Sequence, residues 1–337
     1  MESRKIPIEI FDAVLLLKTA GYKIEDAVKI IQKIYRSKIP KDQIEKIYHN
    51  ELIPYKPTPL QKALLYNKAY KLALTMKKLG RRKIAKKLQE KLGIKIPPMT
   101  IYWWITGKTK PGTTPLKTAP ELGYIIGTAL TDACRSTTAK LRVKDRDYAE
   151  KYAQKLSKIT GKKYQISKTK DGRYVVYHNG TTIRYICKIN LWKIIAYIYP
   201  NEFLKGAFDG DGGPCVSPSK GKLYIAITIG NSSIEFLKFV EYLLKLKNIH
   251  CHWRKVRKEN EEIIIKNMKV KVKETYQLVI YRKNDIKKYT QQIGFEIKRK
   301  QQKLQDALTL LQKYDTKTAA EKWKKLYKKI NGRWTKQ

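Results

Sequence analysis

The sequence has little cysteine, few acidic residues and no long apolar run, and each shortage excludes a class of protein. Its four cysteines (134, 187, 215 and 251) include no Cys-x-x-Cys spacing, so we expect neither a zinc site nor a disulfide framework. No apolar run approaches the roughly 20 residues of a membrane span, and the residues after Met1 do not open a signal peptide. We therefore expect a cytoplasmic protein without a membrane partner.

The shortage of acids leaves 73 Lys+Arg against 29 Asp+Glu, a formal net charge of +44. Self-repulsion at this charge opposes compaction, so a bound polyanion is the simplest explanation, and DNA is the first candidate. The rival explanation is the lysine-rich surface of a thermophile, although such surfaces are usually enriched in Glu as well. The 42% hydrophobic content indicates a folded chain. The composition therefore predicts a folded DNA-binding protein.

Two segments repeat one pattern, in which an apolar helical run contains a glycine and an aspartate follows that glycine five residues later. The aspartates are Asp132 and Asp211. Because glycine has no Cβ atom, helices with glycines at a four-residue spacing can approach each other closely. The predicted helix interface consists of Gly123, Gly127, Gly206 and Gly210.

Two such helices packed side by side would bring Asp132 and Asp211 together at one end. Carboxylates at close range repel each other unless a cation lies between them, and Mg²⁺ prefers carboxylate oxygens. This arrangement suits metal-assisted hydrolysis of a phosphodiester. The alternative is that each Asp is only a helix-end or turn residue. Two copies in the same register favour the paired-carboxylate site.

The chain divides into four predicted segments. Residues 1–115 have a helical pattern throughout and a faint internal repeat, which is typical of helix-turn-helix units. After a Pro- and Gly-containing linker, residues 116–200 and 201–315 form two similar halves. Each half is predicted to run from its motif helix through strands, a helix, further strands and a final helix. Residues 316–337 form a basic tail.

The second helical repeat predicts a DNA-binding helix-turn-helix unit. Residues 80–88 are interpreted as its support helix, and residues 97–108 as an aromatic-rich recognition helix with a glycine stop. An ordinary helical bundle with solvated basic residues is the alternative, and we expect the first repeat to be mainly scaffold. The residues of the second unit expected to contact DNA are Arg81, Arg82, Thr100, Tyr102 and Lys108.

A predicted strand near residues 140–144 alternates basic and apolar side chains, so that Lys140, Arg142 and Lys144 share one face. Further strands are expected over residues 161–188. Basic residues on such a sheet would hold phosphates while polar ones read base edges. The alternative is a solvent-facing strand of a basic protein.

The two glycine–aspartate segments resemble the motif that names the LAGLIDADG homing endonucleases, and the match covers residues 118–313. Two motif copies in one chain resemble the monomeric members of the family. The resemblance implies an α+β fold with two pseudo-symmetric αββαββα halves. Their saddle-shaped antiparallel sheets would lie in the DNA major groove. Residues 1–115 lie outside the family core and are expected to form an added all-α, helix-turn-helix-like module that precedes the two halves. The resemblance further implies that Asp132 and Asp211 ligate Mg²⁺ or another divalent cation.

The resemblance also implies basic catalytic residues near the end of each half. Lys298 and Lys300 are the candidates in the second half, and Lys188 is the candidate in the first. The first motif departs from the family pattern because Ala133 stands where the second has glycine. A Cβ atom there would strain any backbone that requires a positive φ.

These observations favour a monomeric, Mg²⁺-dependent, site-specific endonuclease of homing type that cleaves double-stranded DNA and associates with the nucleoid through it. A DNA-binding regulator that kept the fold and lost cleavage is the alternative, since it would explain the helix-turn-helix units and the altered first motif. Two carboxylates facing phosphates would repel DNA in a pure binder, which argues for the nuclease. A nonspecific DNA-compacting protein would explain the charge but not the motifs.

Overall fold

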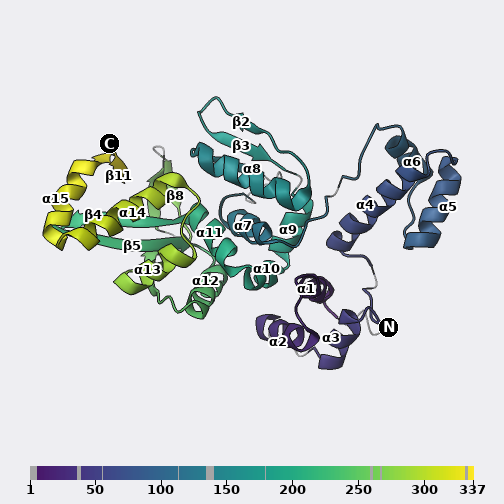
Figure 1. The fold of residues 1–337 in the computed structure, drawn as a ribbon, viewed down its shortest axis with the longest axis horizontal. Helices are drawn as coiled ribbons and strands as arrows, with labels where there is room; N and C mark the ends of the chain where they lie inside the picture. Colours follow the sequence, from purple (N-terminus) through teal and green to yellow (C-terminus); the bar gives the residue numbers. More distant parts are fainter. Residues whose placement is uncertain are drawn as a thin grey trace.

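The computed structural model shows an α+β protein in which an all-helical N-terminal region precedes two halves built on antiparallel sheets (Figure 1). This confirms the predicted fold class. None of the helices described is long and apolar enough to cross a bilayer. The structure describes residues 6–35, 39–54, 56–112, 114–133, 140–178, 180–258, 261–265, 268–330 and 333–337.

The N-terminal region forms two helical units with different partners. Helices α1 (Ile8–Thr19), α2 (Ile24–Tyr35) and α3 (Lys41–Tyr48) share one hydrophobic core with the two halves. Helices α4 (Pro59–Thr75), α5 (Arg81–Leu92) and α6 (Pro98–Ile105) surround a small core of their own and lie to one side of the molecule (Figure 1). The first unit is therefore built into the main body, whereas the second is an appendage.

The first half has a three-stranded antiparallel sheet of order β1-β3-β2. In chain order its elements are α7 (Pro120–Thr128), the π-helical turn η2 (Ala129–Ala133), β1 (Lys140–Val143), α8 (Arg146–Thr160), β2 (Ile166–Lys168), β3 (Tyr174–Tyr177), α9 (Thr181–Lys188) and α10 (Trp192–Ile198).

The strands expected over residues 161–188 occupy only part of that range, because Thr181–Lys188 is helix α9. Its β-branched residues favour a strand, but Ile183 and Ile186 are three residues apart and both are buried. Burial of one helical face against the core outweighs the local preference of these residues for a strand. A turn that contains Gly172, with φ +77°, joins β2 and β3.

The second half shows the αββαββα order, with a β-hairpin inserted before its last strand. Its elements are α11 (Pro200–Asp211), β4 (Gly212–Ser219), β5 (Lys222–Asn231), α12 (Ile234–Leu246), β6 (His252–Arg257), β7 (Glu262–Ile265), β8 (Met268–Lys271), β9 (Thr275–Ile280), α13 (Lys283–Gln292) and α14 (Lys298–Lys313).

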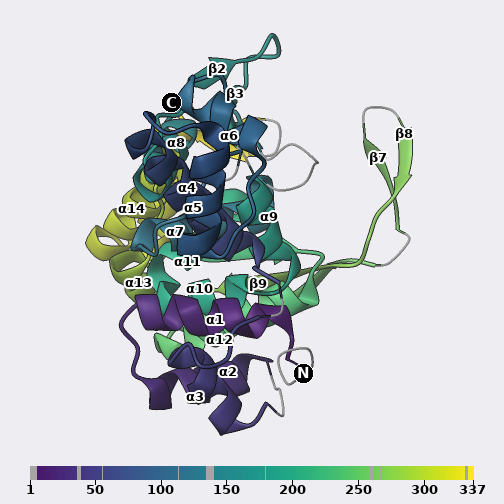
Figure 2. The same cartoon turned by 90° about the vertical axis from the view of Figure 1, so that its right-hand side faces the viewer.

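The main sheet of the second half has the order β4-β5-β9-β6, so β4 is an edge strand. Ile227 and Ile229 are paired with Ile280 and Leu278, and all four are buried on the core face. The alternate residues, such as Thr228, lie on the opposite face. The β7–β8 hairpin projects far from the body of the molecule (Figure 2).

The C-terminal segment forms a compact extension rather than an extended tail. Helix α15 (Thr316–Leu326) leads into a hairpin of β10 (Tyr327–Ile330) and β11 (Arg333–Lys336). Asp315 caps α15, since its carboxylate accepts hydrogen bonds from two backbone N–H groups. A separate hydrophobic core fixes this extension to α14 and to strands β4 and β5.

Candidate active site

The two motif helices, α7 and α11, cross with their backbones almost in contact. A Cβ atom on Gly127 would lie 2.9 Å from the backbone nitrogen of Ala207, and one on Gly206 would lie 3.0 Å from the carbonyl carbon of Tyr124. A Cβ atom on Gly123 would lie 2.8 Å from the Cβ of Tyr199. Helices can pack this closely only where side chains are missing, which explains the glycines at these positions.

The crossing brings the aspartate ends of both motifs together. Asp211 is the last residue of α11, and Asp132 lies in the π-helical turn that continues α7. A Cβ atom on Gly210 would lie 2.7 Å from the Cβ of Thr131 and 3.4 Å from a carboxylate oxygen (Oδ2) of Asp132. The Asp132 carboxylate thus lies beside the residue that precedes Asp211. Both aspartates are half-buried, and each can present oxygen atoms at the same end of the helix pair.

The ends of the two motifs have different backbones. The first ends in a π-helical turn, a feature often found at functional sites, in which the Thr131 hydroxyl donates to the carbonyls of Gly127 and Thr128. Ala133 does not have positive φ, and Gly212 has φ −115°. The expectation that Ala133 strains the backbone is therefore wrong.

Gly212 is required for space instead. A Cβ atom there would lie 2.8 Å from a ring carbon of Phe208 and 2.8 Å from the Thr228 carbonyl oxygen. The glycine lets β4 leave the helix directly against β5. The difference between Ala133 and Gly212 thus reflects the different packing at the two helix ends rather than backbone strain.

The oxygen donors of this site suit a hard divalent cation. The side-chain amide of Asn231 donates to Asp211 at 2.8 Å, which orients that carboxylate. No group of three or more His, Cys, Asp and Glu side chains that could hold a metal occurs among the described residues. Mg²⁺ commonly takes one or two carboxylates and completes its shell with water and substrate phosphate. Asp132 and Asp211 fit that requirement.

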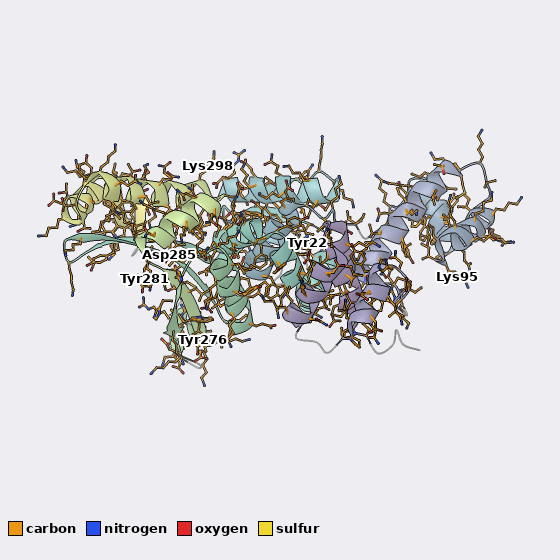
Figure 3. The ribbon with its side chains drawn as sticks, turned by 60° about the horizontal axis from the view of Figure 1, so that its bottom comes forward. Tyr22, Lys95, Tyr276, Tyr281, Asp285 and Lys298 are labelled. Carbon is orange, nitrogen blue, oxygen red and sulfur yellow. The ribbon has the colours of Figure 1, made fainter. Side chains whose placement is uncertain are left out.

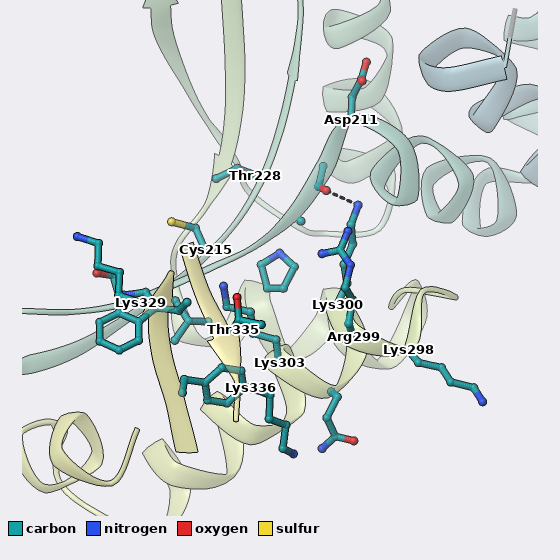
Figure 4. A pocket seen from close by; sticks show the side chains of 18 of the residues that line it. Asp211, Cys215, Thr228, Lys298, Arg299, Lys300, Lys303, Lys329, Thr335 and Lys336 are labelled. Carbon is teal, nitrogen blue, oxygen red and sulfur yellow. Dashed lines mark hydrogen bonds between the residues drawn. The ribbon is translucent and has the colours of Figure 1, made fainter. Parts of the chain in front are cut away.

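Lys300 lies beneath the end of α11 (Figure 4), and its buried amine donates to three carbonyl oxygens. The acceptors belong to Phe208 at 3.1 Å, Asp209 at 2.6 Å and Gly212 at 2.6 Å. Burial lowers the pKa of this amine to about 8. Lys300 therefore adds a buried donor to carbonyls at the end of α11 and the start of β4, where the Phe208 carbonyl also accepts the backbone N–H of Gly212. Its first effect is to fix the backbone on both sides of Asp211.

The other candidate, Lys298, is exposed, and its side chain points away from Asp211 (Figure 4). Its backbone N–H donates to Asp147, while the neighbouring Arg299 pairs with Asp145 at 2.9 Å. The start of α14 is thus fixed to the first half by charged contacts. Lys188 is the last residue of α9.

Asp209 contributes to the site in a way that the sequence interpretation missed. It is buried and accepts hydrogen bonds from the Tyr124 hydroxyl at 2.9 Å and from the backbone N–H groups of Glu296 at 3.1 Å and Ile297 at 3.5 Å. Burial raises its pKa to about 6. Asp209 thereby joins α11 to α7 and to the segment before α14. Residues two apart on a helix face different directions, so its position relative to Asp211 already indicated a second role.

The predicted DNA-contacting strand is β1. Leu141 is buried, while Arg142 and Lys144 are exposed and Lys140 is half-buried. The Arg142 guanidinium lies 2.8 Å from the Asp171 carboxylate at the β2–β3 turn. Lys140 and Arg142 share one face of the first sheet, as the alternation predicts, whereas Lys144 lies in the bend just after β1.

The candidate residues of the second helical unit are mostly exposed on α5, α6 and the turn after α6. Arg81 lies over the ring of Tyr102, with 5.7 Å between guanidinium and ring centroid. Arg82 and Lys108 are exposed, and Thr100 is half-buried. Lys95 of this unit lies at one end of the molecule, far from Lys298 (Figure 3). The unit therefore presents a basic surface well separated from the paired aspartates.

Comparison with known proteins supports the family resemblance. The model of the LAGLIDADG-like domain matches residues 198–294, which confirms the resemblance inferred from the motifs. The uncharacterized protein MJ0398 of Methanocaldococcus jannaschii is 29% identical over 248 residues, which are 68% of this chain and 89% of the relative.

Two solved structures illustrate the similarity. A structure of mesophilic variants of the homing endonuclease I-DmoI is 14% identical to this chain, with a TM-score of 0.36. The matched region is 51% of this chain and 90% of the I-DmoI chain. Full-length DUF199/WhiA from Thermatoga maritima has 18% identity and a TM-score of 0.36, with coverage of 58% and 61% respectively.

Proposed function

We propose that this protein is a divalent-metal-dependent endonuclease that cleaves double-stranded DNA at a specific site and acts in homing. The observation that carries the proposal is the meeting of Asp132 and Asp211 at one end of two closely crossed helices. In a chain of net charge +44, the Asp132 carboxylate lies beside Gly210, the residue that precedes Asp211. Both motif copies belong to one chain, so a monomer completes the site.

The residues of the chain have distinct tasks in this proposal. Asp132 and Asp211 would hold Mg²⁺ between them, and the ion would supply Lewis-acid polarisation of a phosphodiester. Lys300 and Asn231 fix Asp211, while Asp209 and the glycines fix the helix pair. Such preorganisation places the oxygen donors before substrate arrives.

DNA would be held by surfaces on both sides of the paired aspartates. The exposed basic residues of β1 would contact phosphates in the first half, and the second helical unit would add contacts at a distance. A protein held to DNA in this way would associate with the nucleoid.

A non-cleaving DNA-binding regulator is the second candidate, and the environment of Lys300 favours it. The amine that the family resemblance assigns to catalysis is buried and hydrogen-bonded to backbone carbonyls. In a regulator, the buried Lys300 would stabilise the fold and would have no part in catalysis.

The test is incubation of the full chain with a plasmid that carries the gene's own flanking locus without the intervening element. We expect linear plasmid with Mg²⁺ and intact plasmid with EDTA. Binding without cleavage in both conditions would instead establish the regulator. A plasmid of equal length without the locus controls for nonspecific nicking.

A further inference from the structure

A basic groove opens beside Asp211 and runs along the edge strand β4 to the C-terminal hairpin (Figure 4). Its volume is about 990 Å³. Gly213, Cys215 and Ser217 of β4 form part of its floor, the start of α14 forms one wall, and β10 with β11 forms the other. We call this feature the β4 groove.

The charge of the β4 groove has one sign except at the end where Asp211 lies. Among the described residues that line the groove, Asp211 is the one carboxylate, against six basic side chains. Clefts lined by one sign of charge concentrate ions of the opposite sign. The basic lining residues are Lys298, Arg299, Lys300, Lys303, Lys329 and Lys336.

The outer wall of the groove is held in place by specific contacts. The ring of Tyr327 stacks on Trp323 at 3.9 Å between centroids. The Asp306 carboxylate of α14 accepts hydrogen bonds from the Tyr327 hydroxyl at 2.8 Å and from the Lys336 amine at 2.9 Å. One carboxylate thus fixes both strands of the hairpin to α14.

The pairing of the hairpin places four of its five groove-lining residues on one face, with Thr335 on the other. Tyr327 is paired with Lys336, and Lys329 is paired with Trp334, so these four residues share one face. All four line the groove. A wall that is already folded and aimed at a charged cavity indicates a binding surface, since such side chains need little ordering when a ligand arrives.

We propose that the β4 groove binds the phosphodiester backbone of duplex DNA next to the site at Asp211, which makes the C-terminal hairpin an additional DNA-binding element. The inference rests on the proposed function, because a phosphate at Asp211 would direct the following phosphates along β4. A groove that joins a candidate metal site to a row of basic residues suits a regularly charged polymer better than an isolated anion.

Paired substitutions with a matched control test the groove. Lys303→Gln with Lys329→Gln removes two charges from its lining, and Lys313→Gln with Lys325→Gln removes two from exposed positions of the same C-terminal region outside it. Binding of a fluorescent duplex carrying the flanking locus is measured in EDTA across a salt series. The slope of log K against log salt should fall by about two in the groove variant and remain unchanged in the control.

A second measurement locates the DNA. Cys215 is exposed and lines the groove, so duplex DNA should slow its alkylation by a maleimide in the wild type, as followed by mass spectrometry of the labelled peptide. An acidic peptide with the same net charge as the duplex should protect Cys215 from alkylation less than the duplex does.

The outcomes separate this inference from the proposed function. Equal salt slopes in both paired variants, with Cys215 unprotected, would overturn the groove even if the wild type cleaves the plasmid. A reduced slope with protection of Cys215, in a protein that never cleaves with Mg²⁺, would retain the groove and refute the nuclease. Absence of duplex binding in the wild type would overturn both.

Discussion

The two motif ends reach the same place by different means. Asp211 ends a regular helix whose final carbonyls are held by a buried lysine, Lys300. Asp132 lies instead in a π-helical turn beside the buried Tyr148, whose pKa is raised well above its usual value by burial first and then by the Asp132 charge. The second carboxylate is therefore oriented by an amide and a lysine of its own half, whereas the first lies on a π-helical turn packed against a buried tyrosine of its own half.

The supports outside the two halves differ in the same way. The first half is covered by the N-terminal helices, where the buried Asp12 of α1 accepts hydrogen bonds from Thr58 at 2.7 Å and from Tyr185 of α9 at 2.8 Å. The second is supported by its own C-terminal extension. The Asp12 contacts and the C-terminal core thus come from opposite ends of the chain, and substitutions can test the two supports separately.

The largest expected effect comes from removing either aspartate, which tests whether the two motif ends contribute equally to catalysis. Asp132→Asn and Asp211→Asn should each reduce cleavage by about a thousandfold or more, because loss of a metal ligand removes several kcal/mol of transition-state stabilisation. DNA binding should be unchanged or tighter, since one negative charge facing phosphate is lost. Single-turnover plasmid cleavage and a binding titration measure the two effects. Near wild-type cleavage by either variant would refute the paired-carboxylate mechanism.

The next effect concerns the crossing that joins the two halves. Gly127→Ala places a Cβ atom against the backbone of α11 and should lower the free energy of unfolding by about 3 kcal/mol, because neither backbone can move freely. Gly112→Ala is the control, since a Cβ atom there meets nothing within 4 Å. Chemical denaturation of both variants measures the difference. Equal stability would show that the helices separate easily.

Much of this arrangement follows from local sequence, and the rest does not. Glycine spacing indicated the crossing of α7 and α11, and alternation indicated the exposed basic face of β1. The helix at Thr181–Lys188 and the π-helical turn could not be predicted, because both depend on packing against residues distant in the chain. The hydrogen-bond partners of Lys300 and Asp209 could not be predicted for the same reason.

Lys300→Met tests whether the second end is positioned by its lysine. Three carbonyls would lose a buried donor, so we expect the free energy of unfolding to fall by about 2 kcal/mol. Cleavage should fall with it while DNA binding is retained. Lys313→Met is the control, because it changes the same residue type at an exposed position of the same helix, away from Asp211 and the β4 groove. A stable Lys300→Met variant that loses cleavage alone would assign the amine a direct catalytic role.

The support of the first half should depend on pH. Burial raises the pKa of Asp12 from 3.8 to about 6, so the folded state binds more protons than the unfolded state between these values. Stability from this group is therefore present below about pH 4 and is lost as pH rises through 6. Relative to Asp12→Asn, the wild type should lose about 2 kcal/mol between pH 4 and 7 in urea titrations. Asp26→Asn, an exposed change on α2, controls for net charge; a pH-independent difference would contradict the prediction.

The smallest effect compares the two helical units of the N-terminal region. We expect the second unit to contact DNA and the first to act as scaffold, so Lys108→Gln should weaken binding and reduce the slope of log K against log salt by about one. Lys29→Gln, the same change at an exposed position of α2, should leave the slope unaltered. Both variants keep the fold, since neither side chain is buried, and fluorescence anisotropy across a salt series resolves a unit change in slope. Equal loss in both would mean that the whole helical region follows the DNA, and the contrast between a built-in first unit and an appended second unit would then describe packing alone.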